Sequence, residues 1–208
     1  MRLRTIIVAL LPLVAACANG ADTLPGPDPA DSTAVEDSLH FLRPALTAPP
    51  LADRVVSFWA VQGQRRELRL MYRPAPGAVD SVEFARLRVD DRSLVNRPDG
   101  TPIAPGDSIL ITISMVDTLH LITEFQPAGL VFATARPARL WLKYGEADPD
   151  LNQDGVVNAA DSVLVLALKI WKQENLGDPW QLLPSVVNLV ELEVEADIPG
   201  FTRYAVSY

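Results

Sequence analysis

Short runs in which apolar and polar residues alternate recur from about residue 51 to the end of the chain. They restrict its possible folds more than any other feature. In Ile109–Val116 every second residue is large and apolar, and in Val190–Asp197 apolar residues alternate with acidic ones. Successive side chains of a strand point to opposite faces, so each run predicts a strand with one buried and one solvated face. Eighteen prolines also favour short strands over long helices, because proline interrupts a helix.

Further alternating or apolar runs lie at similar spacing along the same region. They are Val55–Val61, Glu67–Tyr72, Val82–Val89, Leu119–Phe125, Leu130–Thr134, Arg139–Tyr144 and Phe201–Tyr208. The first two flank Gln62–Arg66, and this short glycine-containing connection predicts a β-hairpin. Many short strands with regularly placed turns predict an antiparallel, immunoglobulin-like β-sandwich over residues 51–208 rather than a parallel sheet. The sequence has one cysteine, so this sandwich must hold without an internal disulfide.

The first residues have the three parts of an export signal. Arg2 and Arg4 give a positive start, and Ile6–Val14 follows as an apolar run interrupted only by a proline. That run is too short to remain in a bilayer as a spanning helix. Two alanines then precede Cys17. We therefore expect residues 1–16 to be a signal peptide that is removed.

The end of this segment, Leu13–Cys17 (LVAAC), resembles the lipobox of bacterial lipoproteins. The resemblance implies that the Cys17 thiol carries a lipid and that the chain is cut immediately before it. The protein would then be anchored to a membrane of the cell envelope. Residue 18 is alanine rather than aspartate, which is similar to lipoproteins sorted to the outer membrane. The alternative is an ordinary cleaved signal followed by an incidental cysteine.

The next segment, residues 17–50, lacks the alternating pattern. Residues 18–50 contain six prolines, five acidic side chains and one arginine, with a single apolar patch around Leu39, Phe41 and Leu42. Such a composition offers little apolar surface to offset the loss of chain entropy on folding. We therefore expect an extended, disordered tether between the lipid and the domain.

The sharpest local motif is the twelve-residue stretch Asp150–Asp161 (DLNQDGVVNAAD), which has the EF-hand spacing. Calcium takes six to eight oxygen ligands, and such loops supply them from positions 1, 3, 5, 7, 9 and 12. Gly155 stands where the chain must turn sharply, and we expect Val157 to anchor the loop to the core. The predicted Ca²⁺ ligands are Asp150, Asn152, Asp154, the backbone carbonyl of Val156, Asn158 and Asp161. The alternative is a polar turn that binds no metal.

The loop ends in aspartate rather than in the glutamate of most EF-hands. With Asn158 at position 9 and Asp161 at position 12, it resembles the loops of dockerins, which bind calcium and dock onto cohesins. Dockerins carry two such loops, each followed by a helix, and no second copy is present in this sequence. Docking onto a cohesin is therefore disfavoured.

The segment after the loop, Ser162–Glu174, fits a helix or a strand, because Val163, Leu166, Ala167 and Ile170 would share one helical stripe. The stretch from Lys169 to Val206 is similar to the closing part of ZU5-like domains. The matching residues are Trp171, Trp180, Leu183-Pro184-Ser185, Val190–Ala196, Phe201 and Tyr204. The resemblance implies a β-sandwich with a structural or interaction role, and it favours a strand after about one helical turn near Ala159–Val163.

No catalytic motif is visible in the sequence. It has no G-x-S-x-G elbow, no H-E-x-x-H and no phosphate-binding glycine loop. His40 and His120 lack recognisable partners, and we interpret the four tryptophans as core or sheet-edge residues rather than as a sugar-binding platform. The net charge of −8 gives the protein no electrostatic reason to bind nucleic acid.

The sequence as a whole predicts a non-catalytic, calcium-stabilised lipoprotein of the cell envelope. Its sandwich would serve a structural role or bind a protein or a glycan. A dockerin-like assembly module, docking a partner through the calcium loop, is the second hypothesis. An envelope enzyme with an unrecognised site is the third.

Overall fold

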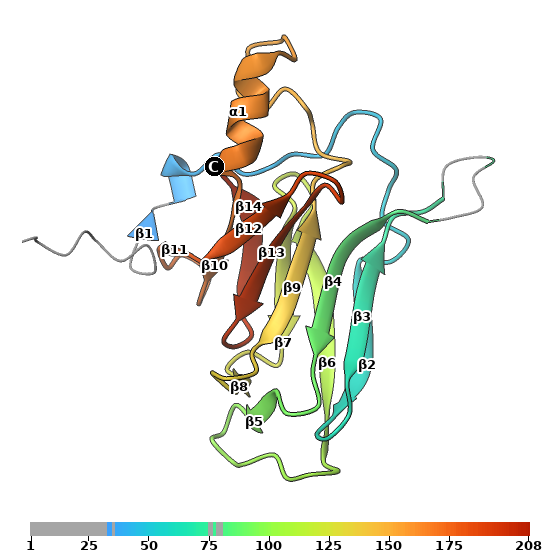
Figure 1. The fold of residues 1–208 in the computed structure, drawn as a ribbon, viewed down its shortest axis with the longest axis vertical. Helices are drawn as coiled ribbons and strands as arrows, with labels where there is room; N and C mark the ends of the chain where they lie inside the picture. Colours follow the sequence, from blue (N-terminus) through green and yellow to red (C-terminus); the bar gives the residue numbers. More distant parts are fainter. Residues whose placement is uncertain (1–32, 35, 75–76, 78–80) are drawn as a thin grey trace, which may run out of the picture.

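The computed structural model of the chain describes residues 33–34, 36–74, 77 and 81–208, and the predicted signal peptide and Cys17 lie outside this part. The described chain forms two antiparallel sheets packed face to face (Figure 1). The β-sandwich predicted from the alternating runs is therefore confirmed. No helix of the described part is long and apolar enough to cross a bilayer.

The larger sheet has seven strands in the order β1-β11-β10-β14-β7-β6-β2. These strands are β1 Thr33–Ala34, β11 Trp180–Leu182, β10 Lys169–Gln173, β14 Arg203–Ser207, β7 Ile122–Gln126, β6 Ser108–Asp117 and β2 Val55–Val61. The smaller sheet has five strands in the order β12-β13-β9-β4-β3. They are β12 Ser185–Asn188, β13 Glu193–Ile198, β9 Ala138–Lys143, β4 Glu83–Val89 and β3 Arg66–Met71.

Three short elements complete the fold. A two-stranded sheet, made of β5 Leu94–Asn96 and β8 Val131–Phe132, lies at the lower end in Figure 1. The helix α1, Ala159–Ala167, stands at the opposite end of the sandwich, and a 3₁₀ turn, Glu36–Ser38, precedes the first packed residues of the N-terminal segment.

The inner faces of the two sheets form the hydrophobic core. Ile111 of β6 and Leu140 of β9 are completely buried, one from each sheet. The Phe125 ring contacts Phe201 and Tyr204, at centroid distances of 5.6 and 5.3 Å. The alternating runs therefore form strands with one buried face, as predicted, because every second side chain of these strands enters one close-packed interior.

The predicted hairpin between the first two strands is wrong. β2 pairs with β6 in the larger sheet, whereas β3 pairs with β4 in the smaller one. The connection between them crosses from sheet to sheet. Two backbone hydrogen bonds to other parts of the chain hold this connection. Gln62 N–H donates to the carbonyl of Asp107 at 2.9 Å, and Gly63 N–H donates to that of Asp91 at 2.8 Å. A turn sequence fixes where the chain reverses but not which strands then pair.

The tether prediction is wrong for residues 36–50, which pack on the sandwich. Phe41 and Leu42 are buried, and the Phe41 ring lies 5.0 Å from the Trp180 ring. Leu42 N–H also donates to the carbonyl of Val206 in β14 at 3.1 Å. Two large apolar side chains are enough to dock a segment whose average composition is that of a linker.

The segment that the sequence left ambiguous contains both a helix and a strand. α1 runs to Ala167, further than the single turn expected, and the strand expected after the helical turn, β10, begins at Lys169. Between them Leu168 is completely buried and leaves the helical conformation, with ψ at 133°. Burial of this residue fixes the point of transition, which periodicity alone does not indicate.

Candidate metal centre

The loop Asp150–Asp161 lies at the end of the sandwich between β9 and α1. Leu151 and Asp161 are buried at its two ends, and residues 152–160 between them are exposed. The loop is therefore anchored at both ends while its middle faces solvent. This arrangement would let a hydrated cation reach the oxygens without any movement of the core.

The first half of the loop is curled around its own side-chain oxygens. Asp150 accepts hydrogen bonds from the backbone N–H groups of Asp154 at 3.1 Å and Gly155 at 2.7 Å. Asn152 Oδ1 accepts from Asp154 N–H at 3.0 Å, and Asp154 Oδ1 accepts from Val156 N–H at 2.9 Å. These turns bring predicted positions 1, 3 and 5 to the concave side of one curl. Gly155 allows this path, since its φ is +86°.

The second half of the loop closes onto the helix. Asn158 is the N-cap of α1, and its Oδ1 accepts from Ala160 N–H at 2.7 Å. Asp161 completes a capping box, with Oδ2 accepting from Asn158 N–H at 2.8 Å. Its other oxygen accepts from Asn152 N–H at 3.3 Å, so position 12 is joined directly to position 3. The carbonyl of Val156 accepts from Asn158 Nδ2 at 3.0 Å, which joins positions 7 and 9.

The electrostatic state of the loop follows from these contacts. Hydrogen bonds from backbone N–H groups, that of Asn158 first, lower the pKa of Asp161 below its ordinary value. Burial raises the pKa of Tyr208, and the negative charges of Asp161 and Asp150 raise it further. Asp161 is therefore an anion at neutral pH, and Tyr208 is a neutral phenol close to two carboxylates of the loop.

The predicted ligands are brought into one loop, but their carboxylates are not gathered tightly. Within the described part of the chain, no three His, Cys, Asp or Glu side chains form a group that could hold a metal ion. Asp161 instead directs both oxygens to backbone N–H groups. A bound Ca²⁺ would need the two asparagines and the carbonyl of Val156 as well as the carboxylates, as the EF-hand pattern requires.

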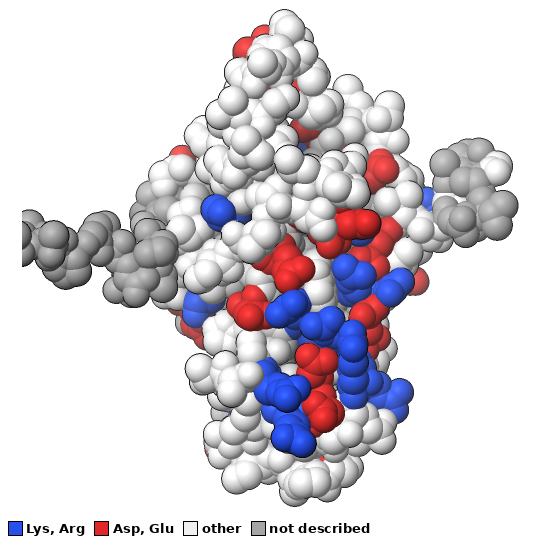
Figure 2. Space-filling view, in the orientation of Figure 1, with Lys and Arg blue, Asp and Glu red and all other residues white. Residues whose placement is uncertain are grey.

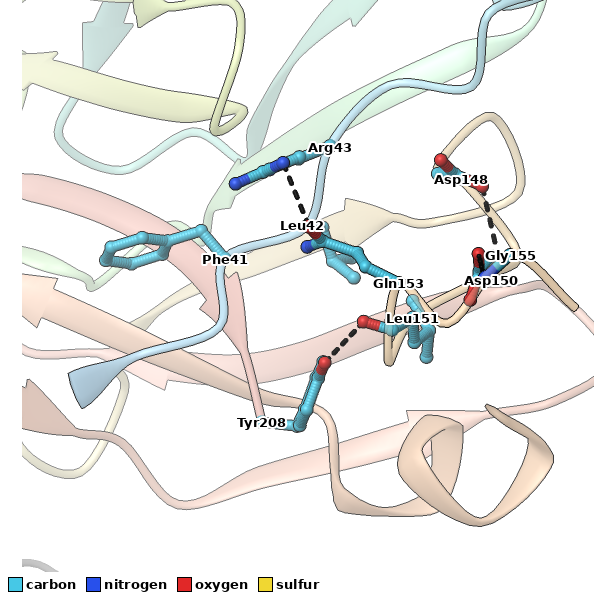
Figure 3. Close-up of a pocket in the computed structure, with 9 residues that line it drawn as sticks. All are labelled: Phe41, Leu42, Arg43, Asp148, Asp150, Leu151, Gln153, Gly155 and Tyr208. Carbon is cyan, nitrogen blue, oxygen red and sulfur yellow. Dashed lines mark hydrogen bonds between the residues drawn. The ribbon is translucent and has the colours of Figure 1, made fainter. Parts of the chain in front are cut away.

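Residues far away in the sequence hold the loop in place (Figure 3). The Tyr208 hydroxyl donates to the carbonyl of Leu151, and Arg43 Nη1 donates to Gln153 Oε1 at 3.1 Å. Asp148 N–H, just before the loop, donates to the carbonyl of Arg43 at 2.8 Å. Together with Asp150 these residues line a hollow of about 200 Å³ beside the loop.

Sequence reasoning missed Arg43 and Tyr208. Neither belongs to a motif, and each meets the loop only because residues 41–42 pair with the end of β14 there. Figure 3 shows residues 41–43 and Tyr208 on one side of the hollow and the loop on the other. The one signal for this contact was the apolar patch around Phe41, since burial of that patch brings Arg43 to the loop.

One expectation about the apolar residues of this region is wrong. Val157 does not anchor the loop, because 61% of it is exposed, and buried Leu151 has that role. Val163 and Leu166, which would share one helical stripe, are exposed, while Leu164 and Val165 pack partly against the core. The helix thus packs one apolar face on the sandwich and leaves another face exposed.

The structure also places the two histidines and the four tryptophans of the chain. The His40 ring stacks on Tyr208 at a centroid distance of 5.1 Å. His120 lies in a turn rather than in the expected strand, and its Nδ1 is 2.8 Å from Asp117 Oδ2. Trp141 and Trp180 are buried and Trp171 is partly buried, whereas Trp59 is exposed on the edge strand β2.

Compared with known protein families, curated proteins and solved structures, the chain shows no significant match. Arguments about function therefore rest on the chain's own residues.

Proposed function

We propose that the protein is a non-catalytic lipoprotein of the bacterial cell envelope whose β-sandwich is stabilised by Ca²⁺ in the loop Asp150–Asp161. The sandwich serves as a structural or binding module for an envelope protein or glycan. The observation that carries the proposal is the curled loop followed directly by a helix. In it Asp150, Asn152 and Asp154 share one concave side, and Asn158 and Asp161 close it.

The physical case for calcium rests on ligand type and on charge. Carboxylates, amide oxygens and a carbonyl are the hard ligands that Ca²⁺ prefers, and the middle of the loop that carries them is exposed to solvent. Without a cation the three aspartates of the loop repel one another, and backbone N–H groups offset only part of that repulsion. Ion binding at millimolar extracellular calcium would therefore add stability to the fold.

The test is thermal unfolding of the chain from residue 17 onward, carrying Cys17→Ser, in chelator and in calcium. At a hundredfold excess over the dissociation constant the ion should add about 2.7 kcal/mol to the free energy of unfolding. That corresponds to a rise of about 5–10 °C in melting temperature. Magnesium should do much less, because it requires tighter octahedral geometry and releases water reluctantly.

Matched variants make this experiment specific. Asp150→Ala and Asp154→Ala should abolish the calcium response and leave the melting temperature in chelator nearly unchanged. Asp91→Ala removes the same charge in the turn after β4, where Asp91 is 3.9 Å from Arg92, and it should retain the full response. Equal melting of the unmutated chain in chelator and in several millimolar calcium would refute the calcium site.

The membrane anchor is tested separately. We propose that Cys17 carries lipid and holds the protein at the envelope, with the outer membrane as its location. Cells supplied with labelled palmitate should label the unmutated protein and not Cys17→Ser. Absence of label from both forms, with equal partition into detergent, would exclude the lipoprotein assignment without affecting the calcium test.

A dockerin-like assembly role remains the second proposal, and one observation favours it. Val156, Val157, Val163 and Leu166 are all exposed on the loop and on α1, which together project from the end of the sandwich. Exposed aliphatic side chains next to a calcium loop would suit a docking helix. This role would be favoured by an envelope protein that the chain retains in calcium but not in chelator, and that Leu166→Asp does not retain.

A further inference from the structure

A second hollow, larger than the one beside the calcium loop, lies under residues 44–54 where this segment crosses the end of the sandwich. Its volume is about 630 Å³, which is in the range of small-molecule sites. Its apolar wall includes Pro44, Pro49, Pro50, Leu51, Met115 and Leu121. We call it the proline-walled cavity.

The walls of the proline-walled cavity are fixed by backbone hydrogen bonds to both sheets. Ala52 N–H donates to the carbonyl of Met71 at 2.9 Å, and Arg73 N–H donates to that of Pro50 at 2.8 Å. On the other side Met115 N–H donates to the carbonyl of Arg54 at 2.8 Å. A cavity held in this way exists before any ligand arrives, and binding then costs little ordering of the protein.

Tyr72 also contributes to the wall of the cavity and is 4% exposed. Its ring is held by Phe84, at a centroid distance of 5.7 Å in an edge-to-face arrangement. Its hydroxyl is inaccessible to solvent and has no hydrogen-bond partner within the described chain. That hydroxyl is therefore out of reach of a ligand in the cavity.

The charged rim of the cavity favours an anionic ligand. Arg54 and Arg73 both line it, and no described residue forms an ion pair with either guanidinium. Asp53 lies on the same rim, so two positive charges stand against one negative charge. Arginine only donates, and it binds carboxylates in bidentate fashion.

We infer that the proline-walled cavity binds a small amphiphile that carries an apolar body and a carboxylate. The apolar body lies against the prolines, Leu51 and Met115. The carboxylate accepts hydrogen bonds from Arg54 and Arg73. This inference does not depend on calcium in the loop or on lipid at Cys17.

The test is calorimetric titration of the chain from residue 17 onward, carrying Cys17→Ser, with sodium decanoate below its micelle-forming concentration. One saturable site is expected. Decyltrimethylammonium, with the same alkyl chain and the opposite charge, should bind at least about tenfold more weakly. Arg54→Gln combined with Arg73→Gln should weaken decanoate binding by about tenfold or more. Ala48→Trp, which places a large ring in the cavity, should abolish it.

Two comparisons separate binding from general structural effects. Tyr72→Phe should change neither decanoate affinity nor melting temperature, because the lost hydroxyl is out of the ligand's reach and had no partner. Arg65→Gln combined with Arg92→Gln changes the net charge equally at the other end of β2 and should bind as the parent does. No saturable site for decanoate, equal affinity for the cationic amphiphile, or no loss in the Arg54 and Arg73 double variant would overturn the inference.

Discussion

The two sheets bury similar inner faces but differ sharply in what they turn outward. The outer face of the five-stranded sheet is a band of alternating basic and acidic side chains, visible across the lower middle of Figure 2. Across it Arg139 lies 3.1 Å from Glu195 and 3.0 Å from Asp197, and Lys143 lies 3.3 Å from Glu193. Charges of opposite sign on this face therefore pair with one another, although the register also sets Arg69 opposite Arg86 and Arg88 opposite Arg139.

The outer face of the seven-stranded sheet is divided into two halves. Over β10, β11 and β14 it is apolar, and the N-terminal segment covers it with Leu39 and Phe41. Over β2 and β6 it is open and carries exposed Trp59, with Leu110 as its cross-strand neighbour. One face of a sandwich can thus be closed by charge pairs and the other by a segment of chain, with different consequences for stability.

The largest expected effect concerns the covering segment. Phe41→Ala removes a buried ring from Trp180 and Ile122 and should cost about 3 kcal/mol in free energy of unfolding. That corresponds to a melting temperature lower by about 6–12 °C. Leu46→Ala, in the same segment but fully exposed, should change stability by less than about 0.5 kcal/mol. Equal, small effects of both substitutions would mean that the segment is a tether after all.

Sequence reasoning succeeded on the inner faces of the two sheets and failed on what covers their outer faces. Alternation predicted β2 and β6 closely, because burial of one inner face controls the identity of every second residue there. It did not predict what covers the outer face. Phe41 docks by meeting Trp180, and no local pattern links positions so far apart in the chain.

The loop shows a similar limit. Its ligand spacing is local, and the sequence predicted the ligand positions and the sharp turn at Gly155, but not the cap that Asn158 forms at the start of α1. The contacts of Arg43 and Tyr208 depend on the pairing of residues 41–42 with the end of β14, and the exposure of Val157 depends on which face of α1 the sandwich accepts. Motif reasoning therefore finds the chemistry of a site more readily than its surroundings.

An intermediate effect is expected inside the charged band. The Glu193 side chain is 5% exposed and lies 3.4 Å from Arg86 and 3.3 Å from Lys143. Glu193→Gln leaves Arg86 with Glu83 and Lys143 with Glu191 as their remaining counter-charges, and it should cost about 1–3 kcal/mol by urea unfolding. Asp197→Asn, at a half-exposed rim position, should cost less than about 1 kcal/mol and nothing measurable in molar salt. A larger cost for Asp197→Asn than for Glu193→Gln would show that burial does not set the strength of this band.

The smallest expected effect distinguishes two tryptophans on the two outer faces. Trp141, in the charged band, is buried beneath Arg86, whose guanidinium lies 4.4 Å from the ring centroid, and its indole N–H donates to Glu195 at 2.6 Å. Trp59 is 59% exposed on the edge strand β2, and no ring or cation contact within the described chain involves it. Trp59→Thr keeps a residue with high strand propensity and should alter the free energy of unfolding by less than about 0.5 kcal/mol.

The reason for this small effect is that removal of an exposed ring creates no cavity and leaves no polar group unpaired. Urea unfolding at two protein concentrations measures it. Acrylamide should also quench part of the native fluorescence of the parent, and that accessible part should disappear in Trp59→Thr. A loss above about 1.5 kcal/mol that grows with protein concentration would mean that a second copy of the chain covers the open half of this sheet. The two outer faces would then differ in what covers them: ion pairs on the five-stranded sheet, and a second copy of the chain on the open half of the seven-stranded sheet.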